Sequence, residues 1–446
     1  MYIKLIQPKT RRRPMDTDLK LHMSPPLSLF TIANMFRNEH RISIENENIE
    51  DLNFDDEPDI VGISVTVDTL PRAVKIAEIF SRKGVKVVAG GIHITTASKF
   101  VPKNAFDALC IGAAEGTWHD IINDAENGEL KKIYRCSPTF CGADIISPAY
   151  DMIDKSKYLY TNIIHTSRGC PFRCDFCYNS SENHGYVNRP IEDVIEDIRA
   201  VKSRHIMFID DNFAGNPKWT KKLLHAIMPM HLIWQAAVSI NAVKDNELLD
   251  LMKKSGCRSL FIGFESINPQ SVKNVHKIQN STKEYEKAVK AIHSRGIMVN
   301  ASFVFGLDGD TKETFDATVD WIVRNKIETV TSHILTPYPG TELYRRIKAE
   351  NRIVKNDLSL YNTANVVYIP KKMTAKELYN GYIDVYRQVY SLKNIIKRLP
   401  DEKSQRKAYL MFNLLYRKYG RFTDFLCRMI SYRRIGYIAE KISEYI

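Results

Sequence analysis

The first 135 residues alternate short apolar runs with segments in which apolar residues recur every three or four positions. The runs predict buried strands, and the segments predict helices that bury one face. The predicted strands are Tyr2–Ile6, Ile60–Ser64, Lys86–Val88 and Phe106–Ile111, and the predicted helices are Leu27–Arg37, Pro71–Lys83 and Thr117–Glu126. Because strands that alternate with helices form parallel sheets, we expect residues 1–135 to be a doubly wound, Rossmann-like α/β domain.

A second alternation of strand and helix patterns runs from residue 158 to about residue 350 and contains six units. Its predicted strands are Thr161–Thr166, His205–Asp210, Ile233–Ser239, Ser259–Gly263, Met298–Phe305 and Thr329–Leu335. Its predicted helices are Ile191–Lys202, Lys221–Ile227, Asn246–Ser255, Lys283–Ser294, Lys312–Val323 and Glu342–Glu350. Six such units predict a partial (β/α)6 barrel at residues 158–350, with its active site at the carboxyl ends of the strands. Residues 136–157 lack a clear period and are interpreted as a linker.

The pattern changes again in residues 351–446, which we expect to form a small, mostly helical extension. A short strand is predicted at Val366–Pro370, a helix at Thr374–Leu392, and further helix from Ser404 to Ile446. Two stripes of large apolar residues recur there at helical spacing: Tyr409, Phe412, Tyr416 and Tyr419, then Phe422, Phe425 and Met429. Such stripes are typical of helices docked on a barrel, of a cap over an apolar substrate, or of a membrane-surface contact.

Composition and charge narrow the class of protein. The chain has 446 residues, 44% of them hydrophobic and 26% charged, as in globular proteins with large cores. No apolar run is as long as a membrane span, and residues 1–10 lack the apolar centre of a signal peptide. Eight cysteines in such a chain indicate reduced thiols or cluster ligands, so we expect a cytoplasmic protein. Most of the net charge of +12 lies in residues 391–446, with 13 Lys or Arg against 5 Asp or Glu, a net of +8.

Three cysteines lie close together in the segment Thr166–Ser180, directly after the first predicted barrel strand. Cys170, Cys174 and Cys177 are separated by three and then two residues, so their thiolates can converge on one metal centre. Three sulfurs suit a four-iron cluster that keeps one iron open to a small-molecule ligand. A structural zinc site would need a fourth ligand, and a disulfide framework is not expected without a secretory signal. Chance clustering of core thiols is the remaining alternative, although the turn around Pro171 is a poor place for a core.

This C-x3-C-x2-C motif, with Phe176 before its last cysteine, resembles the radical S-adenosylmethionine (SAM) superfamily. The resemblance implies that the three cysteines hold a [4Fe–4S] cluster whose open iron binds SAM. An electron from that cluster then cleaves SAM to a radical that abstracts hydrogen from an unactivated carbon. The resemblance also places SAM contacts at the strand ends of the barrel. The SAM-binding candidates carried over in this way are Phe176, Asp210, Ser239, Glu265 and Gly306.

Three turns at the predicted strand ends of the first domain resemble the cobalamin-binding domain of class B radical SAM enzymes. The cobalamin-binding candidates are Ser64, Thr66, Gly90, Gly91, His93, Gly112, Glu115 and Gly116. The D-x-H-x-x-G motif, which supplies a histidine below cobalt in other cobalamin proteins, is absent, because residues 68–73 read Asp-Thr-Leu-Pro-Arg-Ala. We therefore expect a corrin that lacks this histidine ligand. A doubly wound domain without corrin is the alternative, because its sheet also needs glycine at strand ends.

His333 and Tyr338, near the end of the sixth predicted barrel strand, are the candidate catalytic residues. His333 is either a proton donor that points into the barrel or a hydrogen-bonded core histidine. Tyr338 either quenches a radical or contacts substrate, or it packs in the turn between two prolines. Cys136 and Cys141 are interpreted as reduced thiols, with a role as additional cluster ligands as the alternative.

The resemblance predicts a class B radical SAM enzyme with a [4Fe–4S] cluster, SAM and cobalamin as cofactors. The expected reaction is methylation of an unactivated carbon in a lipid or secondary-metabolite substrate. The alternatives are radical cyclisation, oxidation or C–C coupling without methyl transfer, and a non-catalytic iron–sulfur or cobalamin sensor with a basic nucleic-acid-binding tail. We do not favour a nucleic-acid partner. We expect a monomer that takes electrons from a flavodoxin- or ferredoxin-like donor, with peripheral membrane contact through the basic tail as a further expectation.

Overall fold

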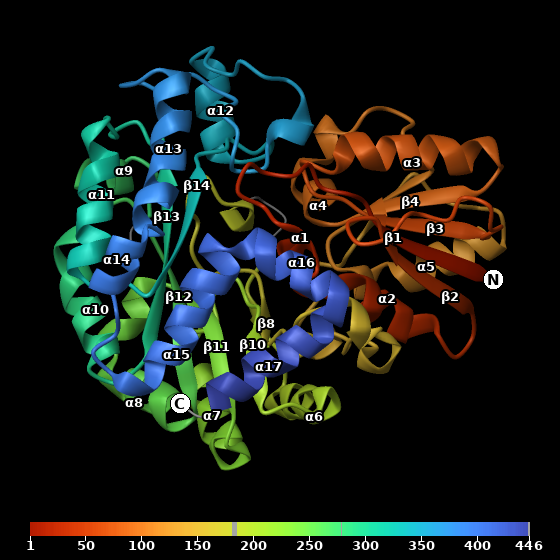
Figure 1. Cartoon of the computed structure of the whole chain (residues 1–446). Coiled ribbons are helices and arrows are strands. Elements are labelled where there is room, and N and C mark those ends of the chain that lie inside the picture. The colour runs from red at the N-terminus through yellow and green to blue at the C-terminus, as the bar shows by residue number, and fades with distance from the viewer. Residues whose placement is uncertain (181–184, 278, 445–446) are drawn as a thin grey trace.

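The computed structural model describes residues 1–180, 185–277 and 279–444, so the last two residues of the predicted extension lie outside it. Its described residues form two parallel six-stranded sheets and one short antiparallel pair, β8 (Ser167–Arg168) with β9 (Val187–Asn188). Figure 1 shows the first sheet at the right, the second at the left, and the C-terminal helices in front of the space between them. The predicted α/β fold class is confirmed.

The first sheet has the strand order β2-β1-β3-β4-β5-β6. Its strands are β1 (Tyr2–Gln7), β2 (Arg41–Asn46), β3 (Ile60–Ser64), β4 (Lys86–Gly90), β5 (Ala108–Ile111) and β6 (Ile133–Arg135). Sequence patterns missed β2 and β6, which are the two edge strands. Residues of β2 alternate charged or polar with apolar side chains, because this edge is only half covered.

Helices cover both faces of the first sheet, as a doubly wound fold requires. They are α2 (Leu27–Phe36), α3 (Leu70–Arg82), α4 (Ile92–Ala97) and α5 (Trp118–Glu126), whereas α1 (Asp18–Leu21) packs its Leu19 with Cys427 of the C-terminal region. Helices α2 and α5 bury their apolar faces in one core, and α3 and α4 bury theirs in the core on the opposite face. In α3, Ala73, Ile76, Ala77 and Phe80 recur at helical spacing and are fully buried.

The second sheet has the order β14-β13-β12-β11-β10-β7 and curves into an open barrel wall (Figure 1). Its strands are β7 (Ile163–Ile164), β10 (His205–Phe208), β11 (Ile233–Val238), β12 (Cys257–Glu265), β13 (Met298–Phe305) and β14 (Thr329–Ile334). Its helices are α6 (Ile191–Val201), α7 (Pro217–Ile227), α8 (Asn246–Lys254), α9 (Pro269–Lys273), α10 (Tyr285–His293), α11 (Glu313–Arg324) and α12 (Glu342–Ala349). All six predicted strands are confirmed, although β7 is only two residues long.

The C-terminal residues are helical and dock on the barrel. Their helices are α13 (Ala375–Val389), α14 (Leu392–Lys397), α15 (Arg406–Leu410), a π-helix (Met411–Lys418), α16 (Gly420–Ile430) and α17 (Tyr432–Glu444). The buried Arg398 donates to the carbonyl oxygens of Ile327 and Glu328 at 2.6 and 3.2 Å, which fastens this region to the start of β14. The predicted strand Val366–Pro370 is wrong, because only an isolated bridge between Ile353 and Tyr368 forms there. Within the described part of the chain, no helix is long and apolar enough to cross a membrane.

Candidate active site

The carboxyl edges of both sheets open onto one large cavity of about 1040 Å³. The first sheet contributes the ends of β3, β4 and β5 through Ser64, Gly91 and Gly112. The barrel side contributes Cys177 from the cysteine loop and Asp211 after β10. Segments far apart in the sequence therefore meet at a single space, as the rule that ligands bind beyond carboxyl strand ends predicts for each sheet.

Glycines shape the first-sheet side of this cavity. Gly91 and Gly112 have φ angles of +100° and +98°, which L side chains rarely adopt. A Cβ atom on Gly91 would lie 2.8 Å from the backbone nitrogen and oxygen of Val65, and one on Gly112 would lie 2.7 Å from Cys136 Cβ. Deeper in, a Cβ atom on Gly62 would lie 2.5 Å from the ring of Trp118. Glycine therefore lets these turns form a closely packed cradle, and their backbone lines a cavity large enough for a corrin ring.

Five of the eight cobalamin-binding candidates line the cavity: Ser64, Gly90, Gly91, Gly112 and Glu115. Thr66 instead supports the start of α3, because its backbone nitrogen donates to Thr69 Oγ1 at 2.9 Å. His93 is fully buried in α4, and its two ring nitrogens have no hydrogen-bond partner among the described residues. Burial lowers the pKa of His93 to about 4, so the ring is neutral. Gly116 packs against Cys136, so corrin contacts of Thr66, His93 and Gly116 stay predictions that the cavity lining does not support.

Glu115 has a partner inside the chain that sequence patterns did not reveal. Arg168 of β8 donates to both carboxylate oxygens of Glu115, at 2.5 and 2.8 Å. The Glu115 side chain is only 3% exposed, whereas that of Arg168 is 33% exposed. This bidentate pair joins the last turn of the first sheet to the start of the cysteine loop and fixes the two cavity walls relative to each other.

The three cysteines of the predicted cluster lie in one loop, in which the Cys177 backbone nitrogen donates to the Cys174 carbonyl at 3.0 Å. Among the described residues, no three His, Cys, Asp or Glu side chains are close enough to hold a single metal ion. A four-iron cluster is larger than one ion, and three thiols on one loop suit its ligand set. Burial raises the pKa of all three thiols, to about 12 for Cys177. Each thiol must therefore lose a proton when it binds iron.

Asp210 supports the exit of β7. Its Oδ1 atom accepts hydrogen bonds from the backbone nitrogens of Thr166 and Ser167, at 2.9 and 2.5 Å, and from both hydroxyls. Burial raises the pKa of Asp210 to about 6, and its Oδ2 atom has no partner among the described residues. Ser239 donates to Asn241 Oδ1 at 2.6 Å and accepts from Asn212 at 3.1 Å. Both SAM-binding candidates thus shape the strand ends, and their contacts with SAM stay predictions.

Glu265 ends β12 with a φ angle of +63°, an unusual conformation for a residue with a side chain. Its carboxylate is buried and paired with Lys277, which also donates to the Gly263 carbonyl at 2.9 Å. Sequence patterns did not identify Lys277 as the partner of this carboxylate. Gly306 donates to Asp310 Oδ2 at 3.0 Å and accepts from the Tyr368 hydroxyl, so the C-terminal region covers its turn.

The remaining candidates from the sequence lie around a pair of stacked tyrosines. Tyr338 stacks on Tyr178, with ring centroids 4.4 Å apart and an interplanar angle of 22°. Tyr178 follows Cys177 directly and lines the large cavity, whereas Phe176 packs against the barrel core. His333 does not line this cavity and contacts Thr363 Oγ1 through Nδ1 at 3.1 Å. Its pKa is lowered to about 4 by burial and by nearby arginines.

His165 also lines the large cavity and was not singled out from the sequence. It lies directly after β7, and its pKa is lowered to about 3 by burial and by Arg168 and Arg189. Its ring is therefore neutral at physiological pH. Its position one residue before Thr166, inside the predicted first barrel strand, is the signal that could have identified it.

Three family models match the chain. The Radical SAM superfamily model matches residues 164–322, the B12 binding domain model matches residues 22–122, and a domain of unknown function (DUF4070) matches residues 341–424. The first two matches cover the cysteine loop with most of the barrel sheet, and the glycine turns with most of the first sheet.

Known proteins resemble the chain over most of its length. Bacteriochlorophyllide d C-12(1)-methyltransferase of Chlorobaculum tepidum is 28% identical over 408 residues, 89% of this chain and 88% of that protein. Anaerobic magnesium-protoporphyrin IX monomethyl ester cyclase of Cereibacter sphaeroides is 24% identical and covers 80% of this chain and 63% of its own length. The structure of the radical SAM methyltransferase TsrM from Kitasatospora setae, with cobalamin and a [4Fe-4S] cluster bound, aligns with a TM-score of 0.67 at 14% identity. That alignment covers 96% of this chain and 98% of TsrM and supports the fold.

Proposed function

Because this chain belongs to the radical SAM proteins that carry a B12-binding domain, we propose that it is an enzyme that methylates an unactivated carbon of a small-molecule substrate. The observation that carries the proposal is the shared cavity: the glycine turns of the first sheet and the cysteine loop of the barrel line the same space of about 1040 Å³. A methyl carrier and a hydrogen-abstracting centre bound at these two walls would face one substrate. Proximity of this kind is what a two-cofactor reaction needs.

When bound, the cluster with SAM supplies hydrogen abstraction and the cobalamin supplies the methyl group. Cys170, Cys174 and Cys177 would hold the cluster, and the turns at Ser64, Gly91 and Gly112 would hold the corrin. The chain's own residues then orient and shield these groups. Asp210 fixes the start of the cysteine loop through four hydrogen bonds.

Other residues restrict access to the cavity. The stacked rings of Tyr178 and Tyr338 close its side next to Cys177, which would exclude water from the reacting centre. The Glu265–Lys277 pair holds the β12 end in its unusual conformation, and we propose that this end contacts SAM. The neutral ring of His165 faces the same cavity, where it can donate or accept a hydrogen bond.

The test uses the anaerobically reconstituted chain, SAM with a deuterated methyl group, and candidate lipid and secondary-metabolite substrates. Methylation predicts S-adenosylhomocysteine and 5′-deoxyadenosine together, with deuterium in the product by mass spectrometry. A productive substrate that yields deoxyadenosine and an unlabelled product would contradict methyl transfer. Failure to bind cobalamin at all would remove the role proposed for the first domain.

One alternative has an observation in its favour. A relative of 24% identity is named as a cyclase rather than a methyltransferase, so we infer that radical ring formation is the second candidate reaction. The same assay separates the two, because cyclisation changes the product by loss of hydrogen and leaves no deuterium label. The similarity to a methyltransferase over 89% of the chain favours methylation.

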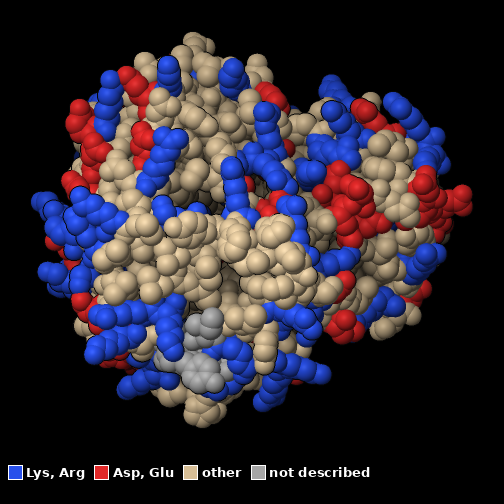
Figure 2. All heavy atoms as spheres, in the orientation of Figure 1, with Lys and Arg blue, Asp and Glu red and all other residues tan. Residues whose placement is uncertain are grey.

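We further propose that the C-terminal helices contact an anionic membrane surface. Phe422, Phe425 and Met429 of α16 are 60, 58 and 70% exposed and lie on one helical face. Figure 2 shows a broad uncharged surface over the C-terminal helices, with Lys and Arg side chains along its borders. An exposed apolar stripe with cationic flanks is the pattern of a helix that lies in the membrane interface.

Co-sedimentation with vesicles that contain phosphatidylserine tests this contact. The variant Phe422→Ser/Phe425→Ser/Met429→Ser should lose most of its binding. Val354→Ser/Ile369→Ser is the control, because these side chains are 48 and 50% exposed outside α16. Equal sedimentation of all three proteins would leave the stripe without a membrane role.

The remaining partners are proposed from the chemistry. Reduction of an iron–sulfur cluster requires an electron donor, and we propose a flavodoxin- or ferredoxin-like protein in the cytoplasm. We propose a monomer, because the cavity is complete within one chain: both of its walls come from the same copy. Light scattering at several protein concentrations would show a mass near 51.3 kDa, and a stable dimer would contradict this.

A further inference from the structure

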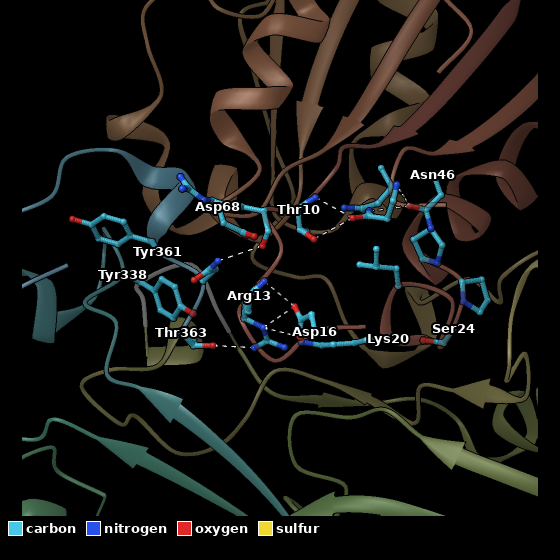
Figure 3. A pocket seen from close by; sticks show the side chains of 17 residues that line it. Thr10, Arg13, Asp16, Lys20, Ser24, Asn46, Asp68, Tyr338, Tyr361 and Thr363 are labelled. Carbon is cyan, nitrogen blue, oxygen red and sulfur yellow. Dashed lines mark hydrogen bonds and ion pairs between the residues drawn. The ribbon is translucent and has the colours of Figure 1, made fainter. Parts of the chain in front are cut away.

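A second cavity of about 540 Å³ lies over the other half of the first sheet's carboxyl edge. Its floor includes Gln7 at the end of β1 and Asn46 at the end of β2, whereas the large cavity lies over β3, β4 and β5. Tyr338 of the barrel and Thr363 of the C-terminal extension close it (Figure 3). The cavity therefore lies beside the proposed corrin site, and residues from both halves of the chain enclose it.

On one wall of this cavity, the charges of three side chains do not cancel. Asp16 accepts from Arg13 Nε at 3.1 Å and from Lys20 Nζ at 2.8 Å, so one carboxylate holds two cations. Figure 3 shows Arg13 and Lys20 on either side of Asp16. The side chains of Arg13 and Lys20 are 22 and 35% exposed, so the excess positive charge is accessible from the cavity. Held side by side, the two cations can bind an anion with little loss of side-chain freedom.

The guanidinium of Arg13 is fixed from two directions. Its Nε is bound by Asp16, and its Nη1 donates to Thr363 Oγ1 at 3.2 Å. Within the described ranges, its Nη2 makes no hydrogen bond. Thr363 has a φ angle of +64°, which is rare for a β-branched residue and indicates strain that the surrounding structure maintains. That conformation places the hydroxyl between Arg13 and His333.

Asp68 is the other carboxyl group in this cavity. Its Oδ1 accepts from the Thr66 hydroxyl at 2.7 Å, and burial raises its pKa above the usual range. Arg11, at the rim, is 3.7 Å from Asp357, and both side chains are more than half exposed, so that pair is weak. The lining therefore holds three cations, Arg11, Arg13 and Lys20, against the two carboxyl groups of Asp16 and Asp68.

Tyr338 connects this cavity to the reacting centre. Its ring lines the smaller cavity and stacks on Tyr178, which lines the larger cavity and follows Cys177 in the chain. A ligand that places an aromatic or apolar body against Tyr338 would lie one ring away from Tyr178 of the cysteine loop, with its acidic group at Arg13. We propose that the smaller cavity binds an acidic group of the substrate, a carboxylate or a phosphate, through Arg13 and Lys20.

This assignment rests on the proposed function only in taking the ligand to be the substrate, and binding can be measured without turnover. The probes are 1-pyrenebutyrate and its neutral counterpart 1-pyrenebutanol, titrated by fluorescence into the full-length reconstituted chain. The carboxylate should bind at least tenfold more tightly than the alcohol. Arg13→Gln and Lys20→Gln should each reduce this preference to less than threefold. Displacement by benzoate or by phenyl phosphate then shows which acidic group fits better.

Arg12→Gln is the matched control, because Arg12 is the adjacent arginine, pairs with Asp18 and does not line the cavity. It should keep the full preference for the carboxylate. Equal binding of the two probes to the parent chain would overturn the proposal, and so would an unchanged preference in both Gln variants. If Arg13→Gln does not fold, as judged by circular dichroism, Lys20→Gln decides. A chain that shows the preference but transfers no methyl group would contradict the proposed reaction and leave the anion site standing.

Discussion

The carboxyl edge of the first sheet is made of glycine turns, whereas the carboxyl edge of the barrel carries buried carboxylates that already have partners. A side chain on Gly91 or Gly112 would collide with Val65 or Cys136, so this wall depends on close packing of its backbone. On the barrel side, Glu265 is paired with Lys277 and Asp310 accepts four hydrogen bonds. Substitutions should therefore act by steric exclusion on one wall and by unpaired charge on the other.

The largest effect on cofactor binding is expected at the cysteine loop, which would act through its thiols rather than through glycine turns or paired carboxylates. Changing Cys170, Cys174 and Cys177 to Ala should abolish iron binding, the broad visible absorption and SAM cleavage, because the cluster loses all its protein ligands. Iron analysis and absorption spectra of the reconstituted protein check this. Cys141→Ala is the control, since that thiol is exposed outside the cavity, and about four irons per chain in the triple variant would refute the assignment.

Adding a side chain to a glycine turn of the first sheet should weaken cobalamin binding. Gly91→Val would place atoms against the backbone of Val65 at a φ angle of +100°, so we expect cobalamin affinity to fall by at least about a hundredfold. Iron content should not change. Gly84→Ala is matched, because Gly84 also has a positive φ but no atom within 4 Å of an added Cβ. Unchanged cobalamin binding by Gly91→Val, measured by equilibrium dialysis, would show that this turn is not part of the cradle.

At the carboxyl edge of the barrel, removing a buried carboxylate should act by leaving its cationic partner unpaired. Glu265→Ala leaves Lys277 buried without a counter-charge, which should cost about 4 kcal/mol of unfolding free energy and weaken SAM binding roughly tenfold, or about 1.4 kcal/mol. Denaturant unfolding and SAM titration measure the two effects. The double variant Glu265→Ala/Lys277→Met should recover stability but not SAM affinity. Recovery of both would mean that Glu265 acts only by neutralising Lys277.

The smallest effect is a pH dependence of stability. Burial raises the pKa of Asp310 to about 6, above the unfolded value of about 3.9. The folded chain then holds more protons than the unfolded chain between these values, so the free energy of unfolding falls as pH rises from about 4 to 6. The contribution is at most about 3 kcal/mol. Asp310→Asn should flatten this slope in denaturant unfolding between pH 4 and 7, and an unchanged slope would assign it to another group such as Asp210.

Local patterns predicted most of the fold because buried parallel strands are continuous apolar runs. The strands β3 and β13 agree with their predicted bounds residue for residue. The pattern failed where burial is incomplete: β2 is a half-covered edge whose charged and apolar residues alternate. It failed in the opposite sense at Val366–Pro370, where apolar residues contribute to the barrel core and form only one bridge.

The candidate site also has one part that local sequence patterns predict and another part that they do not. The cysteine motif and the glycine turns are local, because their chemistry depends on spacing within a few residues, and they could be identified without a structure. The Arg168–Glu115 pair joins residues 53 positions apart, and no pattern within either segment indicates the other. The same holds for Lys277 with Glu265 and for the stacked Tyr178 and Tyr338.

The sequence by itself determined the two parallel sheets, the loop that carries three cysteines, and the turns where only glycine fits. Only the tertiary structure decided that both sheets open onto one cavity, that Glu265 and Glu115 have partners within the chain, and that Arg13 and Lys20 line the same cavity as Tyr338. The physical reason is the separation along the chain between the residues that interact. Periodicity and turn chemistry act between residues close in the chain, whereas cavities and buried ion pairs depend on which distant segments meet when the core packs.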